Sequence, residues 1–205
     1  MQFRKADNVR TKPEWMQCPL VQTDYPGLAY VGPLDEIIVT ETTDKLHNLI
    51  GGSHDNFTIL NNEGQKIFVA VRHERCRTFT VKVFNNYGNE VIQVKKPFTF
   101  CTNRVLVWAP PGVFAGSVEQ KWNTYQVKNE NGDTVLILRA QGGLRMVYSI
   151  KYVYGVDAIG YIGRIRKELP IEGGGDVKSI GVTCPVQLNV RDKAVLIGAC
   201  FLIGC

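Results

Sequence analysis

The sequence has little that could serve as a metal centre or a catalytic centre. Its 6 cysteines form no C-x-x-C pair, and none of its 3 histidines stands at metal-ligand spacing from them. A zinc site is therefore not expected. No serine, cysteine or aspartate lies in a recognisable nucleophile motif, and no histidine is spaced to activate one. The sequence predicts a protein that is not a bond-breaking enzyme.

A cleavable secretory leader is also missing from the first residues. Arg4, Lys5, Asp7 and Arg10 interrupt the stretch in which such a leader would have its apolar segment. Together with the scattered cysteines, this pattern predicts a reducing, cytosolic compartment and free thiols.

The composition that is present is typical of a globular protein, with 44% hydrophobic and 21% charged residues. A chain of 205 residues can form one domain with a sizeable core. We expect a short basic arm over residues 1–24 and a single domain over 25–205. The formal net charge of +5 favours weak attraction to anionic surfaces, either lipid headgroups or nucleic acid.

The clearest internal order is a hairpin unit that occurs three times. Each copy has an aromatic residue, alternating β-forming residues, an Asn-rich turn that ends in glycine, and a second run of β-forming residues. Asn tolerates positive φ and Gly adopts it freely, so such a turn reverses the chain within a few residues. The units run from Phe57 to Val71, from Phe79 to Val94 and from Tyr125 to Leu138.

Further strands are predicted around these hairpins, because other segments are rich in Val, Ile, Thr and aromatic residues and are bounded by Gly, Pro or Asn. They are Glu36–Thr42, Arg104–Trp108, Gly143–Tyr154 and Gly160–Lys167. Helical periodicity is almost absent before residue 190. Many short strands at regular spacing predict a mainly β protein, either a barrel or a sandwich.

The chain reaches Cys205 through an apolar run of 12 residues that follows Lys193. A helix of that length spans only about 18 Å, against a hydrocarbon core of about 30 Å. We expect this helix, over 193–205, inside a closed barrel, whose interior is apolar. The alternative is a membrane segment that continues beyond this sequence. The core or membrane residues would be Ala194, Val195, Leu196, Ile197, Gly198, Phe201, Leu202 and Ile203.

Several segments, in order along residues 25–203, resemble the phospholipid scramblase family. They include Tyr25-Pro-Gly-Leu-Ala-Tyr30, Trp108-Ala-Pro-Pro-Gly112, Gln120-Lys-Trp122 and Lys193-Ala-Val-Leu-Ile-Gly-Ala-Cys-Phe-Leu-Ile203. The resemblance implies a tubby-like fold, a closed β-barrel of about twelve strands around a central hydrophobic C-terminal helix. It also implies calcium-activated, ATP-independent, bidirectional movement of phospholipids between membrane leaflets.

The resemblance further implies a calcium site in the acidic segment before the last helix. Here the segment retains Asp176 but has Lys178 at the second acidic position, which weakens the site because calcium affinity depends on carboxylate charge. Glu172 could contribute a second carboxylate across the three glycines that follow it. Asp176 and Glu172 are therefore the candidate Ca²⁺ ligands, and a solvated loop is the alternative interpretation.

Membrane attachment is the other implied property. Family members carry a cysteine cluster for palmitoylation before the Ala-Pro-Pro-Gly motif, where this chain offers Cys101 alone. The implied partners are phospholipids and an anionic membrane surface, with protein partners and a homo-oligomer left open and nucleic acid not favoured. The implied location is the cytosolic face of the plasma membrane, with a minor nuclear or mitochondrial pool as a further option. A peripheral membrane-binding or protein-binding module without lipid translocation is the alternative function.

Overall fold

The computed structural model describes residues 13–19, 25, 27–42, 55–141, 147–154, 157–168 and 178–204. Twelve strands, a short 3-10 helix and one α-helix make up this part of the chain. The expectation of a mainly β protein is confirmed. Of the two predicted architectures, a barrel or a sandwich, the structure is a barrel. The elements are η1 (Ala29–Val31), β1 (Glu36–Thr42), β2 (Asp55–Leu60), β3 (Lys66–Arg75), β4 (Thr78–Phe84), β5 (Glu90–Lys96), β6 (Arg104–Trp108), β7 (Phe114–Lys121), β8 (Thr124–Asn129), β9 (Thr134–Gln141), β10 (Val147–Tyr154), β11 (Asp157–Glu168), β12 (Ser179–Thr183) and α1 (Val190–Gly204).

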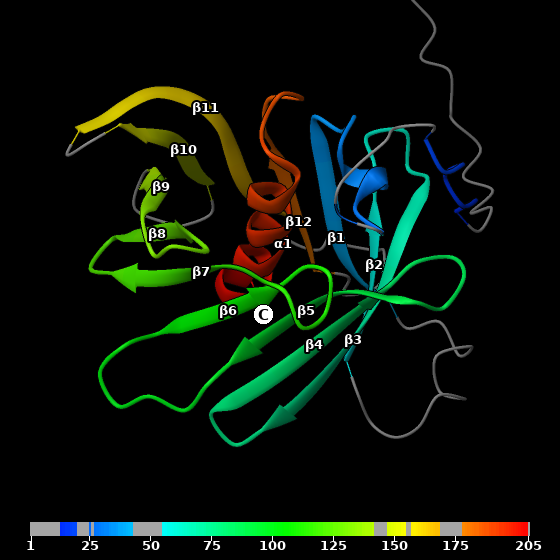
Figure 1. Cartoon of the computed structure of the whole chain (residues 1–205), viewed down its shortest axis with the longest axis horizontal. Coiled ribbons are helices and arrows are strands. Elements are labelled where there is room, and N and C mark those ends of the chain that lie inside the picture. Colours follow the sequence, from blue (N-terminus) through cyan, green and yellow to red (C-terminus); the bar gives the residue numbers. More distant parts are fainter. Residues whose placement is uncertain are drawn as a thin grey trace, which may run out of the picture.

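The strands form one closed antiparallel barrel in which each strand pairs with its neighbours in sequence (Figure 1). The barrel closes where β1 pairs with β12, with Glu36 opposite Thr183 and Thr40 opposite Ser179. Because every connection reverses the chain, odd-to-even connections lie at one end and even-to-odd connections at the other. We call the end with the odd-to-even connections the loop end, and the end with the even-to-odd connections the hairpin end.

The three repeated turns lie at the hairpin end and share one geometry. In the first, Asn61 Oδ1 accepts hydrogen bonds from the backbone N–H groups of Glu63 and Gln65, at 3.1 and 2.8 Å. Asn85 and Asn129 accept the equivalent pairs of bonds in the second and third turns. The side chain of Asn replaces backbone partners in a tight reversal. The predicted hairpin repeat is confirmed in all three places.

Helix α1 begins at Val190, earlier than the expected Lys193. Asn189 precedes the helix, and its Oδ1 accepts a hydrogen bond from the backbone N–H of Arg191 at 2.8 Å. This cap explains why the charged residues Arg191 and Asp192 belong to the helix although the apolar run starts after them. Burial raises the pKa of Asp192 to about 6, with the Glu130 carboxylate acting in the same direction.

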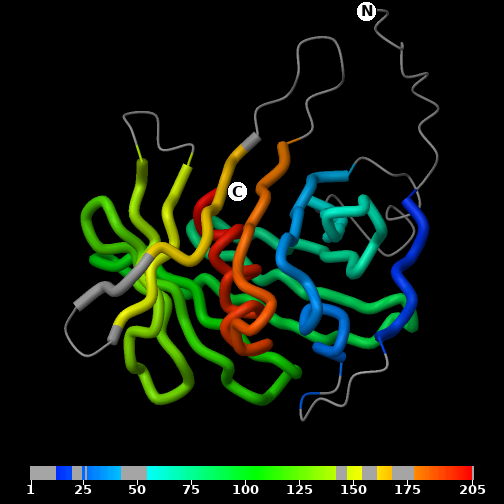
Figure 2. Tube along the Cα trace, turned by 90° about the horizontal axis from the view of Figure 1, so that it is seen from above, coloured from blue at the N-terminus to red at the C-terminus, as the bar shows by residue number. Residues whose placement is uncertain are grey.

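The helix runs through the middle of the barrel, as both ribbon views show (Figures 1 and 2). All residues from Lys193 to Ile203 are buried, so the expected interior placement is confirmed. The strands face it with alternate residues, as in β4, where Phe79, Val81 and Val83 are buried. Phe201 packs edge-on against Phe57 of β2, with ring centroids 5.2 Å apart.

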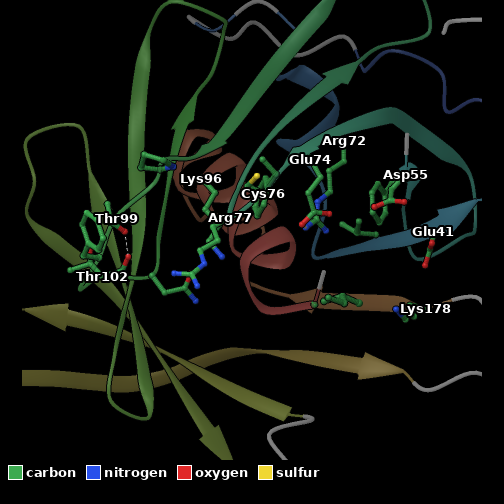
Figure 3. A pocket seen from close by; sticks show the side chains of 18 of the residues that line it. Glu41, Asp55, Arg72, Glu74, Cys76, Arg77, Lys96, Thr99, Thr102 and Lys178 are labelled. Carbon is green, nitrogen blue, oxygen red and sulfur yellow. Dashed lines mark hydrogen bonds and ion pairs between the residues drawn. The ribbon is translucent and has the colours of Figure 1, made fainter. Parts of the chain in front are cut away.

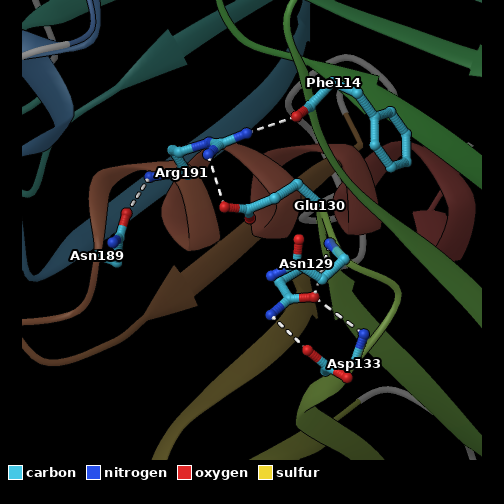
Figure 4. Close-up of polar contacts among 7 residues, drawn as sticks. Phe114, Asn129, Glu130, Asp133, Asn189 and Arg191 are labelled. Carbon is cyan, nitrogen blue, oxygen red and sulfur yellow. Dashed lines mark hydrogen bonds and ion pairs between the residues drawn. The ribbon is translucent and has the colours of Figure 1, made fainter.

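Arg191 fixes the first turn of α1 to the hairpin end (Figure 4). Its guanidinium donates to Glu130 Oε1 in the β8–β9 turn at 2.8 Å and to the backbone oxygen of Phe114 in β7. The helix is therefore held to β7 and to the β8–β9 turn at the point where it enters the barrel.

Lys193 closes the same end from inside. Its side chain is 0% exposed, and Nζ donates to the backbone oxygens of Val31, Gly32, Leu34 and Val186 at 2.7–3.2 Å. Burial lowers the pKa of Lys193, whereas the four carbonyl acceptors favour its charged form. The ammonium ties α1 to the segment around η1 and to the turn before the helix.

Part of the predicted N-terminal arm contacts the barrel. Lys66 of β3 donates its backbone N–H to the Glu14 oxygen at 2.7 Å and accepts a bond from Met16 at 2.9 Å. Trp15 lies over the Lys66 ammonium, with 5.2 Å between Nζ and the ring centroid.

Candidate functional site

The loop end of the barrel gathers chemically distinctive residues from segments far apart in the sequence. The β3–β4 and β7–β8 turns and the β5–β6 loop all follow odd-numbered strands, so they lie at this end. Gly204, the last residue of α1, reaches the same end. The barrel interior is filled by the helix up to this point, which makes the loop end the place where a site can form.

A pocket of about 730 Å³ lies at the loop end (Figure 3). This volume is within the range of small-molecule sites. Strands β1 to β5, the β5–β6 loop, the start of β12 and the end of α1 contribute to its walls. The polar and thiol-bearing lining residues are Glu41, Asp55, Arg72, Glu74, Cys76, Arg77, Lys96, Thr99, Cys101, Thr102, Asn103 and Lys178.

Arg72 is the most unusual residue of the pocket wall. It occupies an inward-facing position of β3, and its side chain is only 8% exposed. One terminal nitrogen lies 3.3 Å from Glu74 Oε1, and the guanidinium stacks on Phe79 with 4.5 Å to the ring centroid. Its Nε atom is buried without a hydrogen-bond partner. A buried donor without an acceptor is costly, so the Arg72 guanidinium is only partly satisfied by its neighbours in the described structure.

Asn103 provides the matching unpaired acceptor. Its Nδ2 donates to Gln120 Oε1 at 2.8 Å, and its backbone oxygen accepts from the Gln120 N–H at 2.8 Å. These two bonds hold the β5–β6 loop against β7. Its Oδ1 atom is buried and has no partner. Two residues that line the pocket therefore each have one buried polar atom without a hydrogen-bond partner.

Charges of both signs line the pocket, and the labelled side chains in Figure 3 show their distribution. Four cationic residues face three carboxylates: Arg72, Arg77, Lys96 and Lys178 against Glu41, Asp55 and Glu74. Of these seven pocket residues, only Arg72 and Glu74 are joined by an ion pair in the described part of the chain. The remaining charges are open to a ligand that carries both signs.

Two exposed thiols line the same pocket. Cys101, the predicted lipidation site, is in the β5–β6 loop, and Cys76 is in the β3–β4 turn. Cys76 has a positive φ of 49°, which an L residue adopts mainly in tight turns. The presence of both cysteines in one pocket was not predicted from the sequence. The alternation of connections would have placed both of them at the same end of the barrel.

Large aromatic side chains project into solvent beside the thiols. Phe98 and Phe100 are 52% and 90% exposed and touch each other edge-on, with centroids 4.9 Å apart. Trp122 in the β7–β8 turn is 96% exposed. Exposed aromatics at one end of a molecule mark a surface that can enter a membrane interface. We call Phe98, Phe100 and Trp122 the aromatic rim.

The predicted calcium ligands cannot be placed. Glu172 and Asp176 lie outside the described residues, between β11 and β12. The flanking strand ends are paired, Glu168 with Ser179, and Lys178 lines the pocket at the loop end. Among the residues that the structure does describe, no cluster of three or more His, Cys, Asp or Glu side chains is arranged to hold a metal ion.

The helix residues predicted from the sequence are all in the barrel core. Ala194, Val195, Leu196 and Ile197 are 0% exposed, as is Phe201, and Gly198 is buried with them. Leu202 and Ile203 are each 7% exposed near the loop end. Within the described ranges, no helix combines the length and the apolar character needed to cross a membrane.

A closed antiparallel barrel threaded by its own C-terminal helix defines the structural class of this protein. The Scramblase family model matches residues 16–205. Phospholipid scramblase 2 of Bos taurus is 31% identical over 222 residues, covering 94% of this chain and 75% of that protein. Phospholipid scramblase 1 of Rattus norvegicus is 31% identical over 216 residues, covering 92% and 64%. The chain therefore belongs to the Scramblase family, and the resemblance found in its sequence is confirmed.

A solved X-ray structure of a protein from Arabidopsis thaliana aligns with 86% of this chain and 93% of its own, with a TM-score of 0.48 and 16% sequence identity.

Proposed function

We propose that this protein moves phospholipids between the two leaflets of a membrane, in both directions and without ATP, from the cytosolic face of the plasma membrane. The observation that carries the proposal is the family match over residues 16–205. The named relatives are phospholipid scramblases, and this chain spans about two thirds to three quarters of the two compared above.

The loop end supports contact with a lipid surface. The aromatic rim supplies apolar side chains that prefer the boundary between water and hydrocarbon. Arg77 and Lys96 line the same pocket as Phe100 and favour anionic headgroups. Lipids and an anionic membrane surface are therefore the proposed partners, and self-association and protein partners remain part of the proposal.

Lipidation at Cys101 is a further part of the proposal. A single acyl chain anchors a protein only marginally, and stable attachment takes a second signal. Cys76 lies on the same pocket wall, and the aromatic rim is adjacent. Either could supply that second signal for a protein acylated at Cys101.

We also propose that calcium activates the translocation. Asp176 and Glu172 would supply carboxylate oxygens, and calcium would add positive charge to the segment before β12. Lys178 already places a positive charge there, so we expect a weak site that responds only to high calcium.

The test is a dithionite assay on liposomes that contain the protein and fluorescent phosphatidylserine or phosphatidylcholine. Translocation brings the protected inner-leaflet dye to the outside, so the fluorescence that survives dithionite falls below one half. We expect this loss to increase with calcium and to be absent for Asp176→Ala. Protected fluorescence that stays constant at every calcium level, in vesicles that bind the protein, would reject translocation.

A peripheral module that binds membranes without moving lipid is the second candidate. The exposed aromatic rim and the net charge of +5 favour it, because both support attachment by themselves. Flotation with anionic vesicles in the absence of dye translocation would identify this function.

A further inference from the structure

The loop-end pocket carries features that membrane attachment alone does not require. Arg72 and Asn103 place an unpaired donor and an unpaired acceptor in its wall, both on buried atoms. Two of the three buried polar side-chain atoms that lack a partner in the described residues therefore belong to residues that line this one pocket. A surface that only rests on a membrane has no need of buried, unsatisfied groups, because water or headgroups reach its polar atoms directly.

The cationic part of the pocket fits a phosphate ester. The Arg72 guanidinium is part of the barrel wall that lines the pocket, while Arg77 and Lys96 line it from the β3–β4 turn and the end of β5. Phosphate oxygens accept several charge-assisted hydrogen bonds at once, and arginine is well shaped to give them. Glu74 neutralises part of the Arg72 charge, which leaves Arg77, Lys96 and Lys178 as the lining cations without an ion pair in the described part of the chain.

The carboxylate part of the pocket fits an ammonium group. Glu41 at the end of β1 and Asp55 at the start of β2 have no ion pair or side-chain hydrogen bond in the described part of the chain. A primary ammonium has three N–H donors for these acceptors, whereas a quaternary ammonium has none.

We propose that this pocket binds a glycerophospholipid headgroup that carries both a phosphate and a primary ammonium. The phosphate lies against Arg72, Arg77 and Lys96, and the ammonium lies against Glu41 and Asp55. The acyl chains leave the pocket past Phe98 and Phe100, which are exposed beside it. The inference deepens the proposed function, on which its lipid substrate class rests, and it adds a headgroup preference.

The direct test is a titration of the full chain with water-soluble headgroups, followed by heteronuclear NMR and calorimetry. Glycerophosphoethanolamine, glycerophosphocholine and inorganic phosphate are the three probes. We expect the Arg72 Nε–H resonance to move with the first probe, and the second to bind roughly tenfold more weakly because its amine cannot donate. Equal affinity for the first two probes would reject the ammonium site. If inorganic phosphate bound as tightly as glycerophosphoethanolamine, the pocket would be a site for anions in general, and the headgroup assignment would be rejected.

Variants separate the two parts of the pocket. Arg77→Gln and Lys96→Gln change exposed or partly exposed residues, and each should weaken both glycerol-containing probes by roughly tenfold. Asp55→Asn should reduce only the preference for the ethanolamine probe. Arg139→Gln is the matched control, since this exposed arginine of β9 is not part of the pocket wall. Binding that is unchanged in Arg77→Gln and Lys96→Gln would overturn the assignment.

Vesicles distinguish a lipid from a soluble metabolite as the ligand. We expect phosphatidylethanolamine vesicles to compete with soluble glycerophosphoethanolamine for the Arg72 signal; a soluble headgroup that binds without such competition would contradict the lipid source. Headgroup binding and lipid translocation are measured separately, so the two proposals can fail independently. Headgroup binding without dye translocation would reject the scramblase activity alone, and translocation without headgroup binding would reject the pocket alone.

Discussion

A single lysine shows how a polar group can be placed in an apolar core. Lys193 is fully buried, and its ammonium has four backbone carbonyl acceptors from two segments that precede α1. Burying a charge is tolerated only when hydrogen bonds replace its lost hydration. The side chain therefore works as a fixed connection between the helix and the barrel end.

Replacing Lys193 by Met should destabilise the fold by about 3 kcal/mol, because several buried carbonyls would lose their donor together. The measurement is the urea midpoint of unfolding. Lys178→Met changes an exposed lysine and should alter the free energy of unfolding by no more than about 0.5 kcal/mol. If both variants unfolded at the same urea concentration, Lys193 would not be a structural connection.

At the level of elements, individual residues of the helix and the strands have the sizes that close packing between them requires. A Cβ atom added to Gly198 would lie 2.5 Å from Val107 Cγ2 of β6, closer than atoms in proteins approach. Glycine at this position lets β6 pack directly against the helix backbone. Gly198, named above among the predicted core or membrane residues, is thus a packing requirement.

Gly198→Val should cost about 1–3 kcal/mol in the free energy of unfolding, since an overpacked core must shift its walls. Thermal unfolding followed by circular dichroism measures the effect. Gly181→Ala in β12 is a suitable control, because the nearest atom to its added Cβ is Glu36 Oε1 at 3.8 Å. A Gly198→Val protein that melts with the Gly181→Ala control would show that the contact can relax.

Strand positions could be predicted from the sequence because period-2 alternation and Asn-Gly turns are local signals. β1 and β6 have the predicted bounds, whereas β11 begins at Asp157, before the expected Gly160. The start of α1 was missed because its first turn is polar and capped, so the apolar run alone did not mark it. The pocket was not predictable residue by residue, since Arg72, Cys101 and Lys178 meet only after the barrel closes.

At the scale of the whole molecule, the two ends of the barrel differ in chemistry. The hairpin end is tied together by the Asn turns, Arg191 and Lys193. The loop end has the pocket, the exposed thiols and the aromatic rim. This asymmetry predicts a single orientation on a membrane, with the loop end toward the lipid.

Phe100→Ser and Trp122→Ser should each weaken binding to anionic vesicles by roughly tenfold, because each removes a large side chain that would leave water. Vesicle flotation at several lipid concentrations measures the change. Tyr87→Ser is the control, since Tyr87 is 73% exposed in the β4–β5 turn at the opposite end. Equal losses in all three variants would contradict a fixed orientation.

The position of α1 in the chain order has a consequence for biosynthesis. Domains usually begin to fold while the ribosome is still making them, starting from the N-terminal part. Here the element that fills the barrel is the last one described, after all twelve strands. The nascent strands therefore emerge without the surface that their inner side chains will cover. A chaperone that shields apolar strands during translation should raise the yield of soluble protein, and a synonymous change that slows translation before Val190 should lower it.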